Sequence, residues 1–99
     1  MPKIFVGFNA DEMFIGPRPS PEEVSLAQFQ TLLENSQWHS RYSPKDEIHG
    51  KFLKEKTGIA LPNGSPRLMY LSAGDVYVEI KILAENIRFF RYHMPTTSI

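Results

Sequence analysis

Two side chains that could bind or protonate a phosphate, those of Lys45 and His49, lie four positions apart in the segment "SPKDEIHGKFLKEKTG", residues 43–58. In a helix this spacing places both on one side, near the unpaired N–H groups of the first turn. Such a helix start can hold a phosphate, although Asp46 and Glu47 compete for its positive end. A solitary histidine is also often a half-buried core residue whose ring donates to a backbone carbonyl. Both interpretations of His49 stay open.

The segment has the signals of a complete helix at both ends. Ser43 suits an N-cap, Pro44 suits the first helical position, and Gly58 suits a left-handed C-terminal residue. The helical wheel predicts an inward face made of Ile48, Phe52 and Leu53, with His49 between the last two. Gly50, in mid-helix, either lets another backbone approach closely or is merely tolerated.

The other elements follow from the pattern along the chain. We expect a first strand at 1–8, a proline-rich loop at 9–24, two helices within 25–58, a three-stranded meander over 66–94 and a tail at 95–99. Ser25 and Gln28 match a capping box at the start of the first helix. The order β-α-α-β-β-β predicts one α+β domain, with a mixed sheet of four to five strands and the helices packed on one face.

The meander has alternating side chains that predict a single apolar face. Its runs are 67–72, 76–83 and 87–94. In the middle run, Val76, Val78 and Ile80 point one way and Tyr77, Glu79 and Lys81 the other. We therefore expect the second face to be the more polar one.

Composition excludes several classes of function. Lys and Arg total 11, as do Asp and Glu, so no global field draws the chain to a polyanion or to anionic lipid. The chain has no cysteine, which excludes disulfides, a thiolate nucleophile and a Cys-ligated zinc. The N-terminal apolar run is too short for a signal peptide, and no stretch has the length of a membrane span, so we expect a cytoplasmic protein. At 99 residues the core is thin enough to favour homo-oligomers.

Other chemistries have weak support. His39, His49 and His93 have no ligand-like spacing, so we expect no metal and no cofactor. The "PNGSP" segment is not a phosphate loop, because it follows no strand and opens no helix. The last run, 87–94, combines aromatic residues with Arg88 and Arg91, which is typical either of a nucleic-acid platform or of a solvated sheet face.

From "VSLAQFQTLLEN" through "GIALPNGSPRLMYLSAGDVYVEIKI" the chain resembles a family of small proteins of archaeal viruses, phages and some bacteria, which includes the viral type III anti-CRISPR ring nucleases. The similarity covers roughly residues 1–83. It lies in the order of four features: a strand ending in Asn9 and Ala10, a leucine-rich helix, a helix ending in the pattern of residues 58–62, and a turn at Gly74 and Asp75 between strands.

The resemblance implies a specific activity. Enzymes of this family are homodimers that bind cyclic tetra-adenylate across the subunit interface and cleave it without metal. A ribose 2′-hydroxyl attacks the adjacent phosphodiester, and a helix histidine protonates the leaving oxygen. This destroys a second messenger of antiviral defence, so the resemblance implies a viral protein acting in the host cytoplasm. A general acid near neutral pKa and a shared cavity are suited to this chemistry.

The family's catalytic residues match this chain only in part. Counting back from Gly58, the family's Gly-His pair aligns with Lys45 and Asp46, and His49 aligns with a threonine one turn on. An Asp is a poor general acid at neutral pH unless its pKa is strongly raised. The family's Asn-Arg pair before the next strand aligns loosely with Pro66 and Arg67, and its Arg-Leu-x-Glu-Gly segment is absent.

Three hypotheses follow. The first is a dimeric binder of a cyclic or linear nucleotide messenger that acts by sequestration or slow cleavage, with Asn9, Lys45, His49 and Arg67 near the phosphates and with Ala10 and Asp46 also at the ligand. The second is a ring nuclease in which His49 is the catalytic acid. The third is a protein-interaction or nucleic-acid-binding module that reuses the fold, through the last strand or the proline-rich loop.

Overall fold

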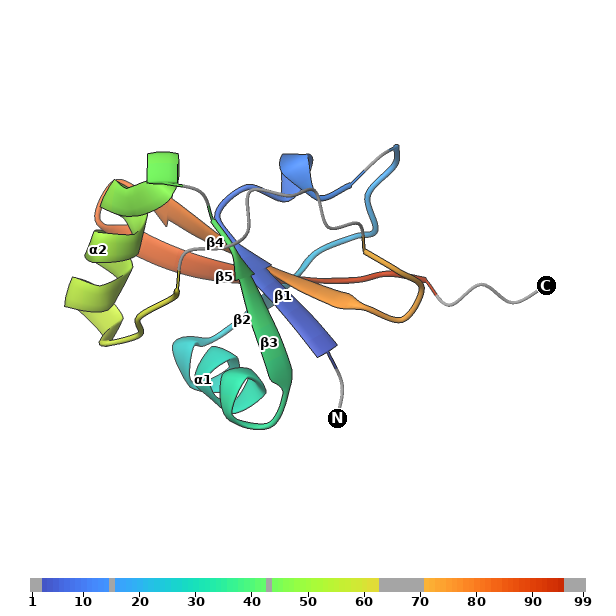
Figure 1. The fold of residues 1–99 in the computed structure, drawn as a ribbon, viewed down its shortest axis with the longest axis horizontal. Helices are drawn as coiled ribbons and strands as arrows, with labels where there is room; N and C mark the ends of the chain where they lie inside the picture. The colour runs from blue at the N-terminus through green and yellow to red at the C-terminus, as the bar shows by residue number, and fades with distance from the viewer. Residues whose placement is uncertain (1–2, 15, 43, 63–70, 96–99) are drawn as a thin grey trace.

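The structure, a computed structural model, describes residues 3–14, 16–42, 44–62 and 71–95. It is an α+β domain with one mixed five-stranded sheet and two α-helices, which confirms the predicted class (Figure 1). In chain order the elements are β1 (Lys3–Gly7), the 3-10 turn η1 (Ala10–Glu12), β2 (Glu22–Val24), α1 (Leu26–Glu34), β3 (Gln37–Arg41), the 3-10 turn η2 (Pro44–Asp46), α2 (Glu47–Thr57), β4 (Val76–Leu83) and β5 (Asn86–His93).

The sheet has the strand order β2-β5-β4-β1-β3. The central strand β1 runs parallel to both of its neighbours, β3 and β4. The strands β4 and β5 form an antiparallel hairpin, and the short β2 pairs antiparallel with β5. Two strands were not expected: β3 lies between the two helices of the range 25–58, and β2 lies within the predicted proline-rich loop 9–24.

One face of the sheet is covered by both helices, as predicted. A buried cluster there joins the two helices to strands β1, β4 and β5, and its members are Ile4, Val6, Val24, Phe29, Leu53, Leu61, Val78, Ile80 and Phe89. The ring of Phe29 from α1 stacks on that of Phe89, with centroids 4.5 Å apart. The capping box is confirmed, because Ser25 accepts from the Gln28 N–H and donates its own N–H to the Gln28 side chain.

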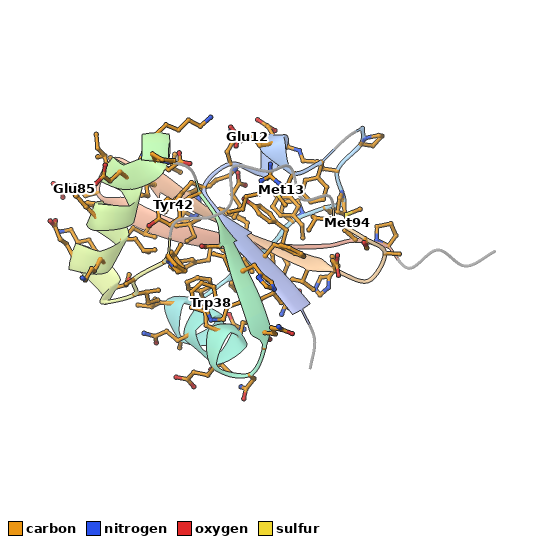
Figure 2. The ribbon with its side chains drawn as sticks, viewed as in Figure 1. Glu12, Met13, Trp38, Tyr42, Glu85 and Met94 are labelled. Carbon is orange, nitrogen blue, oxygen red and sulfur yellow. The ribbon has the colours of Figure 1, made fainter. Side chains whose placement is uncertain are left out.

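The opposite face is also buried, so the expectation of a more polar second face is wrong. A second cluster there consists of Phe5, Ala10, Met13, Tyr77 and Tyr92, with Phe14 packed against it. The loop after β1 folds back over this face and supplies Ala10, Met13 and Phe14. In Figure 2, Met13 marks this side of the sheet and Trp38, which packs on the first cluster, marks the helix side.

The second helix begins later than expected. A 3-10 turn occupies 44–46, and α2 starts at Glu47. The expected N-cap, Ser43, lies outside the described residues. The end at Gly58 is confirmed, since this residue has φ 78° in the left-handed region. Leu53 is buried as predicted.

The expected inward positions of Ile48 and His49 are wrong. Ile48 is 79% exposed, and His49 is exposed as well. The helix instead turns Leu53 toward the sheet, where it joins the buried cluster. A Cβ on Gly50 would sit 3.5 Å from the Tyr42 ring, which is an ordinary van der Waals contact, so glycine is tolerated at this position rather than required.

The last part of the predicted meander is confirmed as the β4–β5 hairpin. Most of its first run, 67–72, lies outside the described residues, and Leu71 and Ser72 are not in a strand. Ser72 and Asp75 form a turn before β4, in which the Ser72 N–H donates to Asp75 Oδ2 at 2.7 Å. Within the described ranges, neither helix has the length and apolar character that crossing a bilayer requires.

Candidate functional site

The carboxyl ends of β1 and β3 lie side by side at one edge of the sheet. The two strands are parallel neighbours, with Gly7 opposite Arg41. The chain leaves β1 into Asn9 and η1, and leaves β3 into η2, which holds Lys45. The strand β1 has β3 on one side and β4 on the other, so the segments that follow β1 and β3 are brought together at this end of the sheet.

An ion pair joins the two segments at this edge. Lys45 Nζ lies 2.7 Å from Glu12 Oε1, although the residues are 33 positions apart. The hydrogen bond to Glu12 is the main cause of a raised pKa for the Lys45 amine. The side chains are 67% and 41% exposed. An exposed pair of this kind contributes little to stability, so Lys45 can exchange Glu12 for an incoming anion at small cost.

His49 lies at the same edge of the sheet. Its ring centroid is 5.6 Å from that of Phe8, the residue directly after β1. The imidazole is exposed, which contradicts the interpretation of His49 as a half-buried core residue. Phe8 also packs edge-on against Tyr42, with ring centroids 5.6 Å apart. Together these rings form an aromatic surface beside Lys45's segment.

The other predicted ligand residues have structural roles at this edge. Asn9 caps η1, its Oδ1 accepting from the Asp11 N–H at 3.0 Å. Ala10 is fully buried, and its N–H donates to a carboxylate of the sheet. Asp46, half-buried, precedes α2 at the N-cap position without a side-chain capping bond. Arg67 lies outside the described residues.

A buried carboxylate beneath this edge was missed by sequence reasoning. Glu79 in β4 is only 6% exposed. Its Oε2 accepts from the Ala10 N–H at 2.8 Å, and its Oε1 accepts from the Tyr92 hydroxyl at 3.0 Å. Lys81 Nζ lies 3.9 Å from Oε1. Glu79 therefore fastens the loop after β1 to the sheet, by satisfying a buried backbone donor with a charged acceptor.

The phenols beside Glu79 are held in the neutral form. Burial first, and then the hydrogen bond to Glu79, raise the pKa of Tyr92 to about 12. Burial and the negative charge of Glu79 raise the pKa of Tyr77 further. A Cβ on Gly7 would lie 2.6 Å from the Tyr77 hydroxyl oxygen and 2.7 Å from the carbonyl oxygen of Arg41, so this position requires glycine. The sequence signal for this network was the alternation that puts Tyr77 and Glu79 on the same side of β4, with Tyr92 in the following strand β5.

The structure also shows how the candidate metal ligands and the cations of the last strand are arranged. No three potential ligands among the described His, Asp and Glu side chains come together as a metal site. The cations considered for a nucleic-acid platform are paired across the sheet: Arg88 with Glu23, and Arg91 with Glu22. The strand that carries them, β5, has neighbours on both sides rather than an open edge.

Comparison of the chain with models of known protein families and with curated proteins finds no match in either.

Proposed function

We propose that this protein binds a nucleotide second messenger, a cyclic oligoadenylate or a related cyclic nucleotide, at the carboxyl edge of β1 and β3. By sequestering or cleaving the messenger it would counter nucleotide-activated antiviral defence. The observation that carries the proposal is the meeting of the segment Asn9–Glu12 with the segment Lys45–His49 at this edge, through the 2.7 Å contact of Lys45 with Glu12.

The edge has the groups that a phosphodiester ligand needs. Lys45 offers a cation that is held in place yet open to solvent. Phe8 and His49 offer aromatic surface on which a base can stack, a contact that tolerates any base. A phosphate would replace Glu12 as the partner of Lys45, since a charge-assisted bond to phosphate is at least as strong as that to a carboxylate.

The exposed imidazole of His49 supports a cleavage step. In that step a ribose 2′-hydroxyl attacks the neighbouring phosphorus and gives up its proton to water, the bond from phosphorus to the 5′-oxygen breaks, and His49 protonates the departing oxygen. The products are a 2′,3′-cyclic phosphate and a free 5′-hydroxyl, with no metal required. A positioned acid of this kind accelerates a reaction typically by about 10²–10⁴-fold.

The proposal includes a homodimer, in which two copies enclose the ring. Ile48, next to His49 on α2, is 79% exposed and provides apolar surface for a second copy. Light scattering after size-exclusion chromatography tests this part. A strict monomer at micromolar concentration contradicts the shared site.

Titration calorimetry with a panel of cyclic oligoadenylates and cyclic dinucleotides tests binding. We expect Lys45→Gln to weaken binding of the preferred ring by about tenfold or more, because a charge-assisted contact is lost. The matched control is Lys54→Gln, an exposed lysine in the last turn of the same helix. Absence of binding to every ring, or equal affinities for the two variants, contradicts the proposal.

Chromatography of the nucleotide after incubation separates the two modes of action. Intact ligand that stays with the protein indicates sequestration, whereas linear fragments indicate cleavage. If cleavage occurs, His49→Ala should reduce the single-turnover rate, measured at saturating protein, by about 10²-fold or more. An unchanged rate in His49→Ala excludes His49 as the acid.

A further inference from the structure

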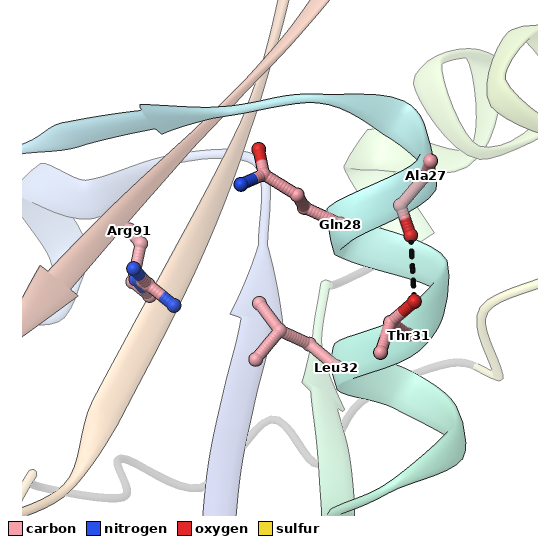
Figure 3. Close-up of a pocket in the computed structure, with 5 residues that line it drawn as sticks. All are labelled: Ala27, Gln28, Thr31, Leu32 and Arg91. Carbon is pink, nitrogen blue, oxygen red and sulfur yellow. Dashed lines mark hydrogen bonds between the residues drawn. The ribbon is translucent and has the colours of Figure 1, made fainter.

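A hollow between α1 and β5 is lined by Ala27, Gln28, Thr31, Leu32 and Arg91 (Figure 3). Arg91 is the only charged side chain among these five, and it is already paired with Glu22 on β2. This hollow therefore has no uncompensated charge to offer to a ligand. A second cavity, beside α2, differs in this respect.

The cavity beside α2 has a volume of about 260 Å³. It is lined by the segment 60–61, which follows the helix, and by a side of α2 that carries Glu47, Gly50, Lys51 and Lys54. Ligand pockets in proteins usually measure about 300–1,000 Å³. The cavity therefore suits a small ligand built on a single ring.

The ring of Tyr42 completes the lining and is held in place by its neighbours. Its hydroxyl donates to the Leu61 carbonyl oxygen, and its ring packs edge-on against Phe8. A Cβ on Gly50 would lie 3.5 Å from this ring, so the missing side chain at Gly50 leaves that part of the ring open to the cavity. An aromatic ligand that packs against Tyr42 gains more than its buried area alone provides.

The charges that line the cavity do not balance. The carboxylate of Glu47 lies 3.8 Å from Lys51, one turn further along α2. Lys54 is exposed, and its side chain takes part in none of the ion pairs formed among the described residues. Together these three side chains leave one positive charge, which a monoanion neutralises and a dianion exceeds.

Another lysine of the same helix shows how such a side chain contacts an aromatic ring. Lys56 Nζ lies 5.7 Å from the centroid of the Phe52 ring. Lys51 and Lys54 can contact a ring in the cavity in the same way, because a lysine packs its aliphatic stem on apolar surface while the ammonium stays in water.

We propose that the cavity beside α2 binds a small aromatic monoanion of the aryl carboxylate class. The ligand ring lies against Tyr42 and Leu61, and its carboxylate accepts from the Lys54 ammonium. The site uses Lys54 where the candidate nucleotide site uses Lys45, so either proposal can fail without the other.

The probe is benzoate, titrated at constant pH and ionic strength into ¹⁵N-labelled protein and followed by two-dimensional NMR. For a ligand of this size we expect a Kd on the order of 1–10 mM, with saturable shifts at amides 47–54 and 60–61. Benzamide keeps the ring without the charge and should bind about threefold more weakly. Acetate keeps the charge without the ring and should bind about tenfold more weakly. The proposal is overturned by the absence of a saturable shift at these amides up to about 50 mM benzoate, or by equal affinities for benzoate and benzamide.

A charge variant tests the role of Lys54. Lys54→Gln should weaken benzoate binding about threefold and leave benzamide binding unchanged. The matched control is Lys56→Gln, whose lysine lies over Phe52 rather than at the cavity, and it should leave both affinities unchanged. Equal benzoate affinities of these two variants contradict the proposal.

A variant that fills the cavity tests the role of Tyr42. Gly50→Leu places a side chain over the open part of the Tyr42 ring and should weaken benzoate binding by about tenfold or more. Leucine has a higher helix propensity than glycine, so we expect this variant to fold at least as well as the unaltered protein. Unchanged benzoate affinity in folded Gly50→Leu contradicts the proposal. If Gly50→Leu fails to fold, the comparison of benzoate with benzamide on the unaltered protein and on Lys54→Gln still decides.

Discussion

On the helix side of the sheet, α1 and α2 cover an almost wholly aliphatic and aromatic cluster, whereas on the opposite side one loop covers aromatic rings and a charged carboxylate. The helix side is held by burial of apolar area, which has no direction and tolerates small shifts. The loop side is held at Glu79 by hydrogen bonds with defined donors. Loss of one such bond frees a particular segment.

This difference bears on the candidate site. The loop that covers the second face begins with Asn9 and η1, and η1 carries Glu12, the partner of Lys45. The hydrogen bond from the Ala10 N–H to Glu79 therefore holds the segment Asn9–Glu12, on one side of the candidate site, against the sheet. The other wall, the start of α2, is attached through Leu53 in the first cluster. A ligand at this edge would contact two segments that are secured by different physical means.

The largest effect is expected on the helix side. Phe29→Ala removes a fully buried ring stacked on Phe89 and should lower the free energy of unfolding by about 3–5 kcal/mol. Urea unfolding followed by circular dichroism measures this. Leu26→Ala, at a residue 37% exposed in the same helix, is the control and should cost about 1 kcal/mol. Equal costs for the two variants would contradict a core centred on Phe29.

A smaller but more local effect is expected on the loop side. Glu79→Ala leaves the Ala10 N–H and the Tyr92 hydroxyl without their acceptor and should cost about 2–4 kcal/mol. Hydrogen exchange should show lost protection at residues 10–14 beyond the global change. Glu85→Ala, exposed in the turn after β4, should stay within about 0.5 kcal/mol of the unaltered protein. Unchanged relative protection of 10–14 would show that Glu79 does not hold the loop.

Alkaline pH should weaken the loop side selectively. The folded pKa of Tyr92, about 12, lies above its ordinary value of 10.0, so the folded state binds the proton more tightly than the unfolded state does. The stability from this proton is present below about pH 10 and is lost as the pH rises toward 12. We expect a fall on the order of 1–2 kcal/mol between about pH 9 and pH 11. Urea unfolding at each pH measures it, and Tyr92→Phe should reduce the fall but leave the part that comes from Tyr77, whose pKa is also raised.

The smallest effect is expected for the exposed charges of β2 and β5. Arg88 and Glu23 form a two-bonded pair with side chains 49% and 46% exposed. A double-mutant cycle with Arg88→Gln and Glu23→Gln should give only a small coupling, which falls as salt rises. If the coupling is as large as the cost of Glu79→Ala, the exposed carboxylate of Glu23 contributes as much to stability as the buried carboxylate of Glu79. Burial would then not distinguish the two.

Local signals in the sequence predicted local structure well. Ser25 and Gln28 sit three residues apart and form the expected capping box, and Gly58 ends the second helix in the left-handed region. The alternation along 76–83 correctly placed Val78 and Tyr77 on opposite faces. These features depend on contacts within a few residues, which a short sequence window contains.

The errors all involve distant contacts. The stretch Gln37–Arg41 has no clear alternation, and it is a strand because β1 pairs with it. Ile48 is exposed because α2 packs on the sheet through Leu53, a member of the buried cluster that distant strands complete. The candidate residues Asn9, Lys45 and His49 were named from sequence, yet Phe8, Glu12 and Glu79, which position them, were not.

By itself the sequence determined the class of the fold, the start of α1 and the end of α2, because caps, glycines and apolar periods act over one or two turns. The tertiary structure alone decided that the second face of the sheet is closed and that Glu79 is buried there. The cost of burying that carboxylate depends on donors 69 and 13 residues away. The same holds for the edge where Lys45 meets Glu12, since only the parallel pairing of β1 with β3 brings the two segments together.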